Sequence, residues 1–210
     1  MKAQITIKRI QDLLMKGCQT IHVDDDTSRR MWWAALEVIQ KEFLSQNYQQ
    51  GGIWVASPLP ALNDKKFFNQ LHGWLWSPEG FPYFQKENAG FLPVNHSAKK
   101  KKDLDFITNY KVLNLSQKDG YEPFLMVITP NFQCILSIVG EKDKRILLMK
   151  CDEESLKISI ELMHAKLNQE NYEEGVKFRN AINNLGNLNI NNQFENSFWP
   201  ILSANLAKMG

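Results

Sequence analysis

The side chains that could do chemistry lie scattered along the chain. The four histidines are His22, His72, His96 and His164, and none has an acidic residue at a spacing typical of a catalytic pair. No serine sits in the G-x-S-x-G pattern that exposes a nucleophile on a sharp turn. The sequence therefore predicts no catalytic residue and favours a protein that is not an enzyme. Residues far apart in a sequence can still converge in a fold, so an enzyme of unfamiliar type is the least favoured of three hypotheses.

Metal and phosphate sites are predicted absent on the same kind of evidence. No histidine pair has the H-x-x-x-H spacing of a zinc site. Asp24, Asp25 and Asp26 could hold a hard cation, but a helix N-terminus explains three carboxylates followed by Thr-Ser more simply. Gly51 and Gly52 precede a strand-like run, whereas a phosphate-binding loop follows one. We expect no cofactor.

The chain has three cysteines, an odd number without a C-x-x-C pair, so we expect no disulfide framework. Cys134 and Cys151 lie inside apolar, strand-like runs. We expect both to be buried thiols that act as small hydrophobic side chains.

Tryptophan is the residue type that points most directly to binding. The chain has six, and this side chain combines a large contact area with a polar N–H group. Trp32 fits an apolar helix stripe, so the adjacent Trp33 must point in another direction. Core packing explains most tryptophans, but the residues predicted to contact a ligand or a partner are Trp33, Trp54, Trp74 and Trp76.

The first half of the chain predicts a helix followed by two short strands. Trp32, Leu36, Ile39 and Phe43 recur on one face of a helix that begins after the aspartates and is ended by Gly51 and Gly52. Residues 53–56 are predicted to form a short buried strand and residues 74–76 a strand fragment, with a short helix between them. Residues 77–103 are predicted to be a long loop, and its run Lys99–Lys102 is interpreted as solvated, without nucleic acid as a partner.

The clearest β region follows this loop. Four apolar runs, at residues 110–115, 124–129, 132–139 and 145–151, are separated by short turns, which is typical of an antiparallel meander. Continuous apolar strands are covered on both faces, so helices should pack against the sheet. The predicted fold class is α+β, an antiparallel β-meander with a GAF/PAS-like layout packed against helices.

Helices are predicted at the C-terminal end. One carries the stripe from Leu156 to Leu167, a second covers about residues 171–185, and a last one starts near Ser197 with Pro200 in its first turn. We divide the chain into an α+β domain of sensory type, residues 1–168, and a helical extension, residues 169–210. The extension should pack on the domain or form an output or dimer contact through Phe198, Trp199, Leu202 and Leu206.

Composition restricts location and partners. The 210 residues carry a net charge of +2, too little to imply a polyanionic partner. No run approaches the roughly 20 apolar residues that span a bilayer, and the N-terminus has no apolar signal segment. We expect a cytoplasmic protein without a membrane span.

Four segments, in their order and spacing, resemble the N-terminal sensory region of a group of cyanobacterial sensor histidine kinases. They are MWWAAL at 31–36, GIWVASPLPAL at 52–62, EPFLMVITP at 122–130 and FWPIL at 198–202. The resemblance implies the sensory part of a two-component system alone, because this chain lacks the H-E-x-R-T-P phosphoacceptor motif and the glycine-rich nucleotide boxes of the kinase core. The family's sensory region offers no binding motif from which site residues could be transferred.

Two functional hypotheses lead. The first is a non-enzymatic sensory or regulatory input module, which binds a small ligand or a protein and relays the signal through its C-terminal helices to a histidine kinase, a response regulator or a second copy. The alternative is a scaffold or assembly protein that binds another protein through exposed tryptophans.

Overall fold

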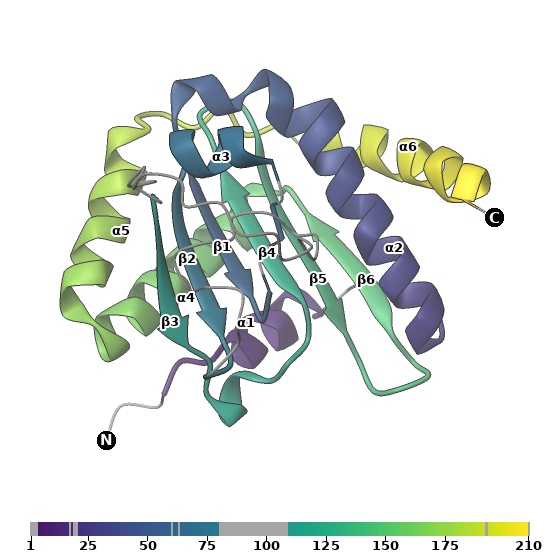
Figure 1. The fold of residues 1–210 in the computed structure, drawn as a ribbon, viewed down its shortest axis with the longest axis horizontal. Helices are drawn as coiled ribbons and strands as arrows, with labels where there is room; N and C mark the ends of the chain where they lie inside the picture. Colours follow the sequence, from purple (N-terminus) through teal and green to yellow (C-terminus); the bar gives the residue numbers. More distant parts are fainter. Residues whose placement is uncertain are drawn as a thin grey trace, which may run out of the picture.

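The computed structural model describes residues 4–16, 18, 21–59, 61–62, 64–79, 109–191 and 193–209. A six-stranded sheet forms the centre of the molecule, in the order β3-β2-β1-β4-β5-β6 (Figure 1). The strands are β1 Ile53–Ser57, β2 His72–Ser77, β3 Tyr110–Asn114, β4 Phe124–Ile128, β5 Gln133–Val139 and β6 Ile146–Lys150. The helices are α1 Ile7–Leu14, α2 Asp25–Val38, α3 Lys65–Gln70, α4 Glu153–Glu170, α5 Tyr172–Asn184 and α6 Gln193–Met209.

The meander is confirmed for three of its four predicted strands. β4, β5 and β6 pair antiparallel in sequence order. β3 was expected to pair with β4, and that prediction is wrong, because β3 pairs parallel with β2 at the opposite end of the sheet. β1 occupies the place beside β4 instead. The fold class is α+β, with a mixed sheet.

Burial explains why β3 takes the edge. Every residue of β1 and β4 is buried, so these apolar strands belong in the middle of a sheet that is covered on both faces. In β3, Lys111, Val112 and Asn114 are exposed, as suits a strand with a neighbour on one side only. A short connection favours pairing of consecutive strands but does not enforce it.

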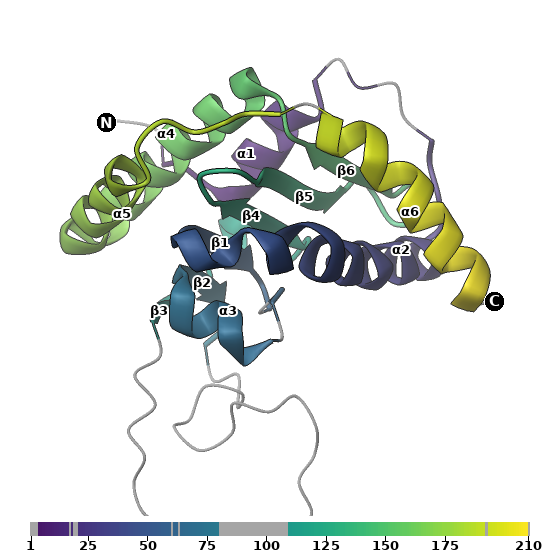
Figure 2. The same ribbon diagram turned by 90° about the horizontal axis from the view of Figure 1, so that it is seen from above.

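Helices cover both faces of the sheet, as the apolar strands predicted (Figure 2). One face packs against α2, α3 and α6, and its core includes Trp54, Leu125 and Phe132. The other packs against α1, α4 and α5, and its core includes Trp74 and Trp76. The two C-terminal helices, α5 and α6, therefore lie on opposite faces of the sheet.

Capping sets where the helices begin. The carboxylate of Asp24 accepts the backbone N–H of Thr27 at 2.7 Å, which confirms the aspartate cluster as the start of α2. The helix runs on into a π-helical turn, Ile39–Phe43, and a chain reversal at Gly51, where φ is +77°. The predicted start of α6 is wrong. The helix begins at Gln193, whose N–H is accepted by Asn191 Oδ1 at 2.9 Å, so Pro200 lies inside it.

Both strand-region cysteines are buried, as predicted. Burial raises the pKa of the Cys134 thiol well above its usual value and that of Cys151 to about 12. These thiols therefore stay protonated and unreactive at neutral pH.

Two sequence predictions concern other parts of the chain. The lysine run Lys99–Lys102 and most of the predicted loop 77–103 lie outside the described residues. Among the helices that are described, none is both long enough and apolar enough to cross a membrane.

Candidate functional site

Two tryptophans of β2 reach the junction of α4 and α5. Trp74 and Trp76 alternate along the strand and point to the same face of the sheet. Trp74 Nε1 donates to Glu174 Oε2 at 3.0 Å, and Trp76 Nε1 donates to Glu170 Oε2 at 2.6 Å. Glu170 ends α4 and Glu174 lies in the first turn of α5. The two indoles therefore tie both helices to the sheet at the point where they meet.

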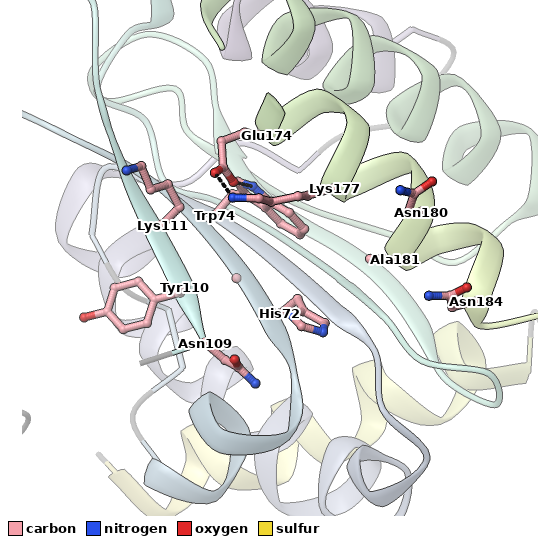
Figure 3. A pocket seen from close by; sticks show the side chains of 11 residues that line it. His72, Trp74, Asn109, Tyr110, Lys111, Glu174, Lys177, Asn180, Ala181 and Asn184 are labelled. Carbon is pink, nitrogen blue, oxygen red and sulfur yellow. Dashed lines mark hydrogen bonds and ion pairs between the residues drawn. The ribbon is translucent and has the colours of Figure 1, made fainter. Parts of the chain in front are cut away.

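A hollow of about 410 Å³ opens beside Trp74, between the β3 edge of the sheet and α5 (Figure 3). We call it the α5 hollow. Strands β2 and β3 contribute side chains from the face that α5 covers, because Trp74 is paired with Lys111 and His72 lies two residues before Trp74. Helix α5 forms the opposite wall with Glu174, Lys177, Asn180, Ala181 and Asn184.

Glu174 organises the charges of the α5 hollow. Its side chain is buried, and its second oxygen, Oε1, accepts Lys177 Nζ at 2.7 Å. Burial by itself would raise the pKa of this carboxyl, but the hydrogen bonds from Lys177 and Trp74 outweigh it, and nearby Lys111 adds to their effect, so that the pKa is lowered. Glu174 therefore stays ionised at neutral pH and holds the ammonium of Lys177 at the wall.

The remaining lining is mixed, because Tyr110 and Ala181 join His72, Asn180 and Asn184. His72, Asn180 and Asn184 are exposed, and each side chain can both donate and accept hydrogen bonds. Figure 3 shows Asn180 and Asn184 along α5, with Lys111 near Glu174. Chemically, the hollow offers charge and hydrogen bonds to a small polar molecule.

A buried ion network stands behind this site. Lys166 Nζ donates to Asp119 Oδ1 at 2.7 Å and to Glu170 Oε1 at 2.6 Å, and it lies 5.2 Å from the centre of the Trp76 ring. Asp119 Oδ1 also accepts the backbone N–H of Ile7 at 2.9 Å. The network thus joins α1, α4 and β2, and it fixes the end of α4 from which α5 departs.

A second surface surrounds Trp33, which is 56% exposed. Trp33 lines two neighbouring hollows, one of about 420 Å³ that it shares with the exposed Leu59 and Tyr121, and one of about 740 Å³ that it shares with Phe67. We call this the Trp33 surface. Charged side chains at this surface pair with one another. Arg145, for example, forms ion pairs with both Asp25 and Glu122.

The four predicted tryptophans do not form one site. Trp74 lines the α5 hollow and Trp33 stands on α2, while Trp54 and Trp76 have no exposed surface and belong to the core. Trp54 lies on the face opposite Trp74, over Gly73, where an added Cβ would sit 2.2 Å from the indole. A surface formed by all four tryptophans is therefore not present.

The predicted output helix is also divided by its packing. Phe198 and Leu202 are buried in the core beneath α2, and Trp199 and Leu206 are only partly buried. Within the described structure, a dimer or output contact is open to Trp199 and Leu206 but not to Phe198 and Leu202.

Sequence reasoning missed Glu174, Lys111 and Lys177. Glu174 follows the N-cap residue Asn171 by three positions, so helix capping accounts for its place in the sequence without any contact to a tryptophan. Across the parts of the chain that the structure describes, no three His, Cys, Asp or Glu side chains gather as a metal ion would require.

Comparison with known proteins adds a family but no activity. No curated protein matches the chain. No solved structure matches it either. The family model named Domain of unknown function (DUF8628) matches residues 8–210, so the chain belongs to that family.

Proposed function

We propose that the protein is a non-enzymatic sensory or regulatory module that binds a small ligand in the α5 hollow and relays this event through its C-terminal helices. The observation that carries the proposal is the position of the hollow. One wall is the sheet and the other is α5, and the hydrogen bond from Trp74 to Glu174 joins the two walls.

A ligand in this position touches the two parts that must move relative to each other. A ligand shifts an equilibrium only if its affinity differs between the two states. A molecule that contacts both the sheet and α5 meets this condition, because any displacement of α5 changes its contacts. The segment after α5 is held to the turn between β4 and β5, where Asn189 N donates to Pro130 O at 2.8 Å, and it leads to α6.

The partner in this proposal follows from the resemblance to the sensory region of histidine kinases. Trp199 and Leu206, which keep exposed surface on α6, would contact a kinase, a response regulator or a second copy. We infer a cytoplasmic location, where such partners act.

The first test compares the native and denatured masses of the purified protein. The wild type should retain a ligand of a few hundred daltons. Asn180→Leu with Asn184→Leu, which puts apolar side chains into the hollow, should lose it. Asn183→Leu is the matched control, since Asn183 is an exposed residue of α5 outside the hollow.

Hydrogen exchange extends this test to a ligand that dissociates during purification. The small-molecule fraction of a cell extract should slow amide exchange in α5 of the wild type and not of the filled variant. If no mass is retained and exchange in α5 does not respond, the sensory proposal fails.

The alternative, a scaffold or assembly protein, is favoured by one observation. Trp33 is 56% exposed between two hollows, as suits a side chain that enters a partner's surface. Light scattering should then detect self-association that Trp33→Ser abolishes. Tyr172→Ser, which removes another exposed aromatic side chain, should leave it unchanged.

A further inference from the structure

We propose that the α5 hollow takes a small organic anion, whose carboxylate or phosphate group lies between Lys111 and Lys177. This inference rests on the proposed function, since it names the class of ligand for the same site. The two ammonium groups belong to opposite walls, one on β3 and one on α5, so an anion that contacts both would connect the sheet to the helix.

The charges that line the hollow leave an excess of positive charge. Lys111 and Lys177 face a single carboxylate, that of Glu174, and His72 is the other titratable side chain of the α5 and β2 walls. Glu173 lies close enough to act on Lys177 but does not line the hollow. Among the described residues, Lys111 is in no ion pair, and its charge acts on Glu174 without a direct contact.

The geometry at Glu174 keeps the second ammonium in place. Glu174 is only 6% exposed and accepts Trp74 through one oxygen and Lys177 through the other. A buried carboxylate with both oxygens engaged is a fixed support, and Lys177, which is 64% exposed, still has donors for a ligand. Figure 3 shows Lys177 and Lys111 near this carboxylate.

The rest of the lining decides what the anion carries. His72, Asn180 and Asn184 supply hydrogen bonds, and Trp74, Tyr110 and Ala181 supply apolar surface. A hydroxy acid, an amino acid or a phosphate ester with further polar groups matches the lining. The Trp33 surface differs, because its arginines are already ion-paired.

The test is a titration with three probes at constant ionic strength: D-gluconate, inorganic phosphate and D-glucitol. Glucitol differs from gluconate only in having a neutral hydroxymethyl group in place of the carboxylate. The readout is the indole N–H resonance of Trp74 in a nitrogen–proton NMR spectrum, identified by its loss in Trp74→Phe. This N–H touches Glu174 and so reports on the carboxylate beside the site.

We expect saturable shifts of this resonance with gluconate, phosphate or both, and roughly ten-fold weaker binding of glucitol, as the loss of a charge-assisted hydrogen bond implies. A carboxylate ligand is indicated if gluconate binds more tightly, and a phosphate ester if phosphate does. Lys111→Gln with Lys177→Gln should weaken binding at least ten-fold. Lys157→Gln, on the exposed side of α4, should not change it.

The anion proposal is overturned if neither anion shifts the Trp74 resonance, if glucitol binds as tightly as the anion that binds better, or if the double variant binds like the wild type. Circular dichroism checks that the double variant is folded, because Lys177 supports the buried carboxylate of Glu174 although both lysines are themselves exposed. The sensory proposal fails on a different result, when neither retained mass nor exchange in α5 reveals any ligand.

Discussion

Lys166 donates to Asp119 across 2.7 Å, and neither side chain has any exposed surface. The pair joins α4 to the turn that precedes β4, and Asp119 also accepts the N–H of the first residue of α1. Burying two charges has a large desolvation cost, so the pair is no proof of high stability. Removing one partner of the pair should nevertheless lower the free energy of unfolding, because the other charge stays buried without its partner.

Lys166→Met should therefore destabilise the protein strongly. It leaves Asp119 without its cation, and loss of one partner of a buried pair costs about 3–5 kcal/mol. Urea denaturation followed by circular dichroism measures the change in free energy of unfolding. Lys157→Met, at an exposed position of the same helix, should change it by less than about 0.5 kcal/mol. Equal effects of the two variants would show that the pair is unimportant.

The stability of the protein should also depend on pH, because of the carboxyl group of Asp119. Burial would raise the pKa of this carboxyl, but hydrogen bonds from Lys166, Ser116 and the Ile7 N–H outweigh it and lower the pKa. A carboxyl with a lowered pKa in the folded state adds stability above its unfolded pKa, about 3.9, and loses it as the pH falls through the folded pKa.

The measurement compares the wild type with Asp119→Asn in urea at several pH values. The difference in free energy of unfolding should be constant near neutral pH and should shrink below about pH 4. A difference that persists unchanged into strong acid would mean that the charge of Asp119 does not support the fold.

The bond between Trp74 and Glu174 should hold α5 on the sheet. Trp74→Phe keeps the aromatic contact with Phe178, whose ring centre lies 5.3 Å away, but removes the indole N–H. Glu174 then loses one donor, which costs about 1–3 kcal/mol. Hydrogen exchange should accelerate in α5 more than in β4. Uniform acceleration across the protein would instead indicate general destabilisation.

Alanine substitutions on the two faces of α6 should have different effects on stability and on self-association. Phe198→Ala empties a fully buried position and should cost about 3–5 kcal/mol of folding free energy. Trp199→Ala and Leu206→Ala remove partly exposed side chains and should cost less, while weakening any dimer seen by light scattering. If both exposed-face variants associate like the wild type, α6 is not the dimer contact.

Much of the local structure could be predicted from local patterns. The apolar runs of β4, β5 and β6 are separated by turns too short for any connection but a hairpin, so their antiparallel pairing followed. The start of α2 was marked by Asp24, whose side chain caps the helix within three residues. Cys134 and Cys151 were expected to be buried because they lie among apolar neighbours.

Long-range contacts had no comparable pattern. The edge position of β3 depends on a parallel pairing with β2 that no turn specifies. Pro200 was placed in a first turn because proline is tolerated there, yet the cap at Asn191 starts the helix earlier. Trp74 was proposed for its residue type, but the hydrogen bond that defines its role joins residues 100 positions apart.

The sequence alone determined the α+β class, the apolar strands covered on both faces, the start of α2 and the turns between β4, β5 and β6, because these depend on residues close to one another in the chain. Only the tertiary structure decided that Trp54 and Trp76 are core residues, that Phe198 faces inward, and that Lys111, Glu174 and Lys177 meet around one hollow. Those outcomes depend on which strand edges pair and on which faces helices cover, and both are set by packing free energy summed over the whole sheet.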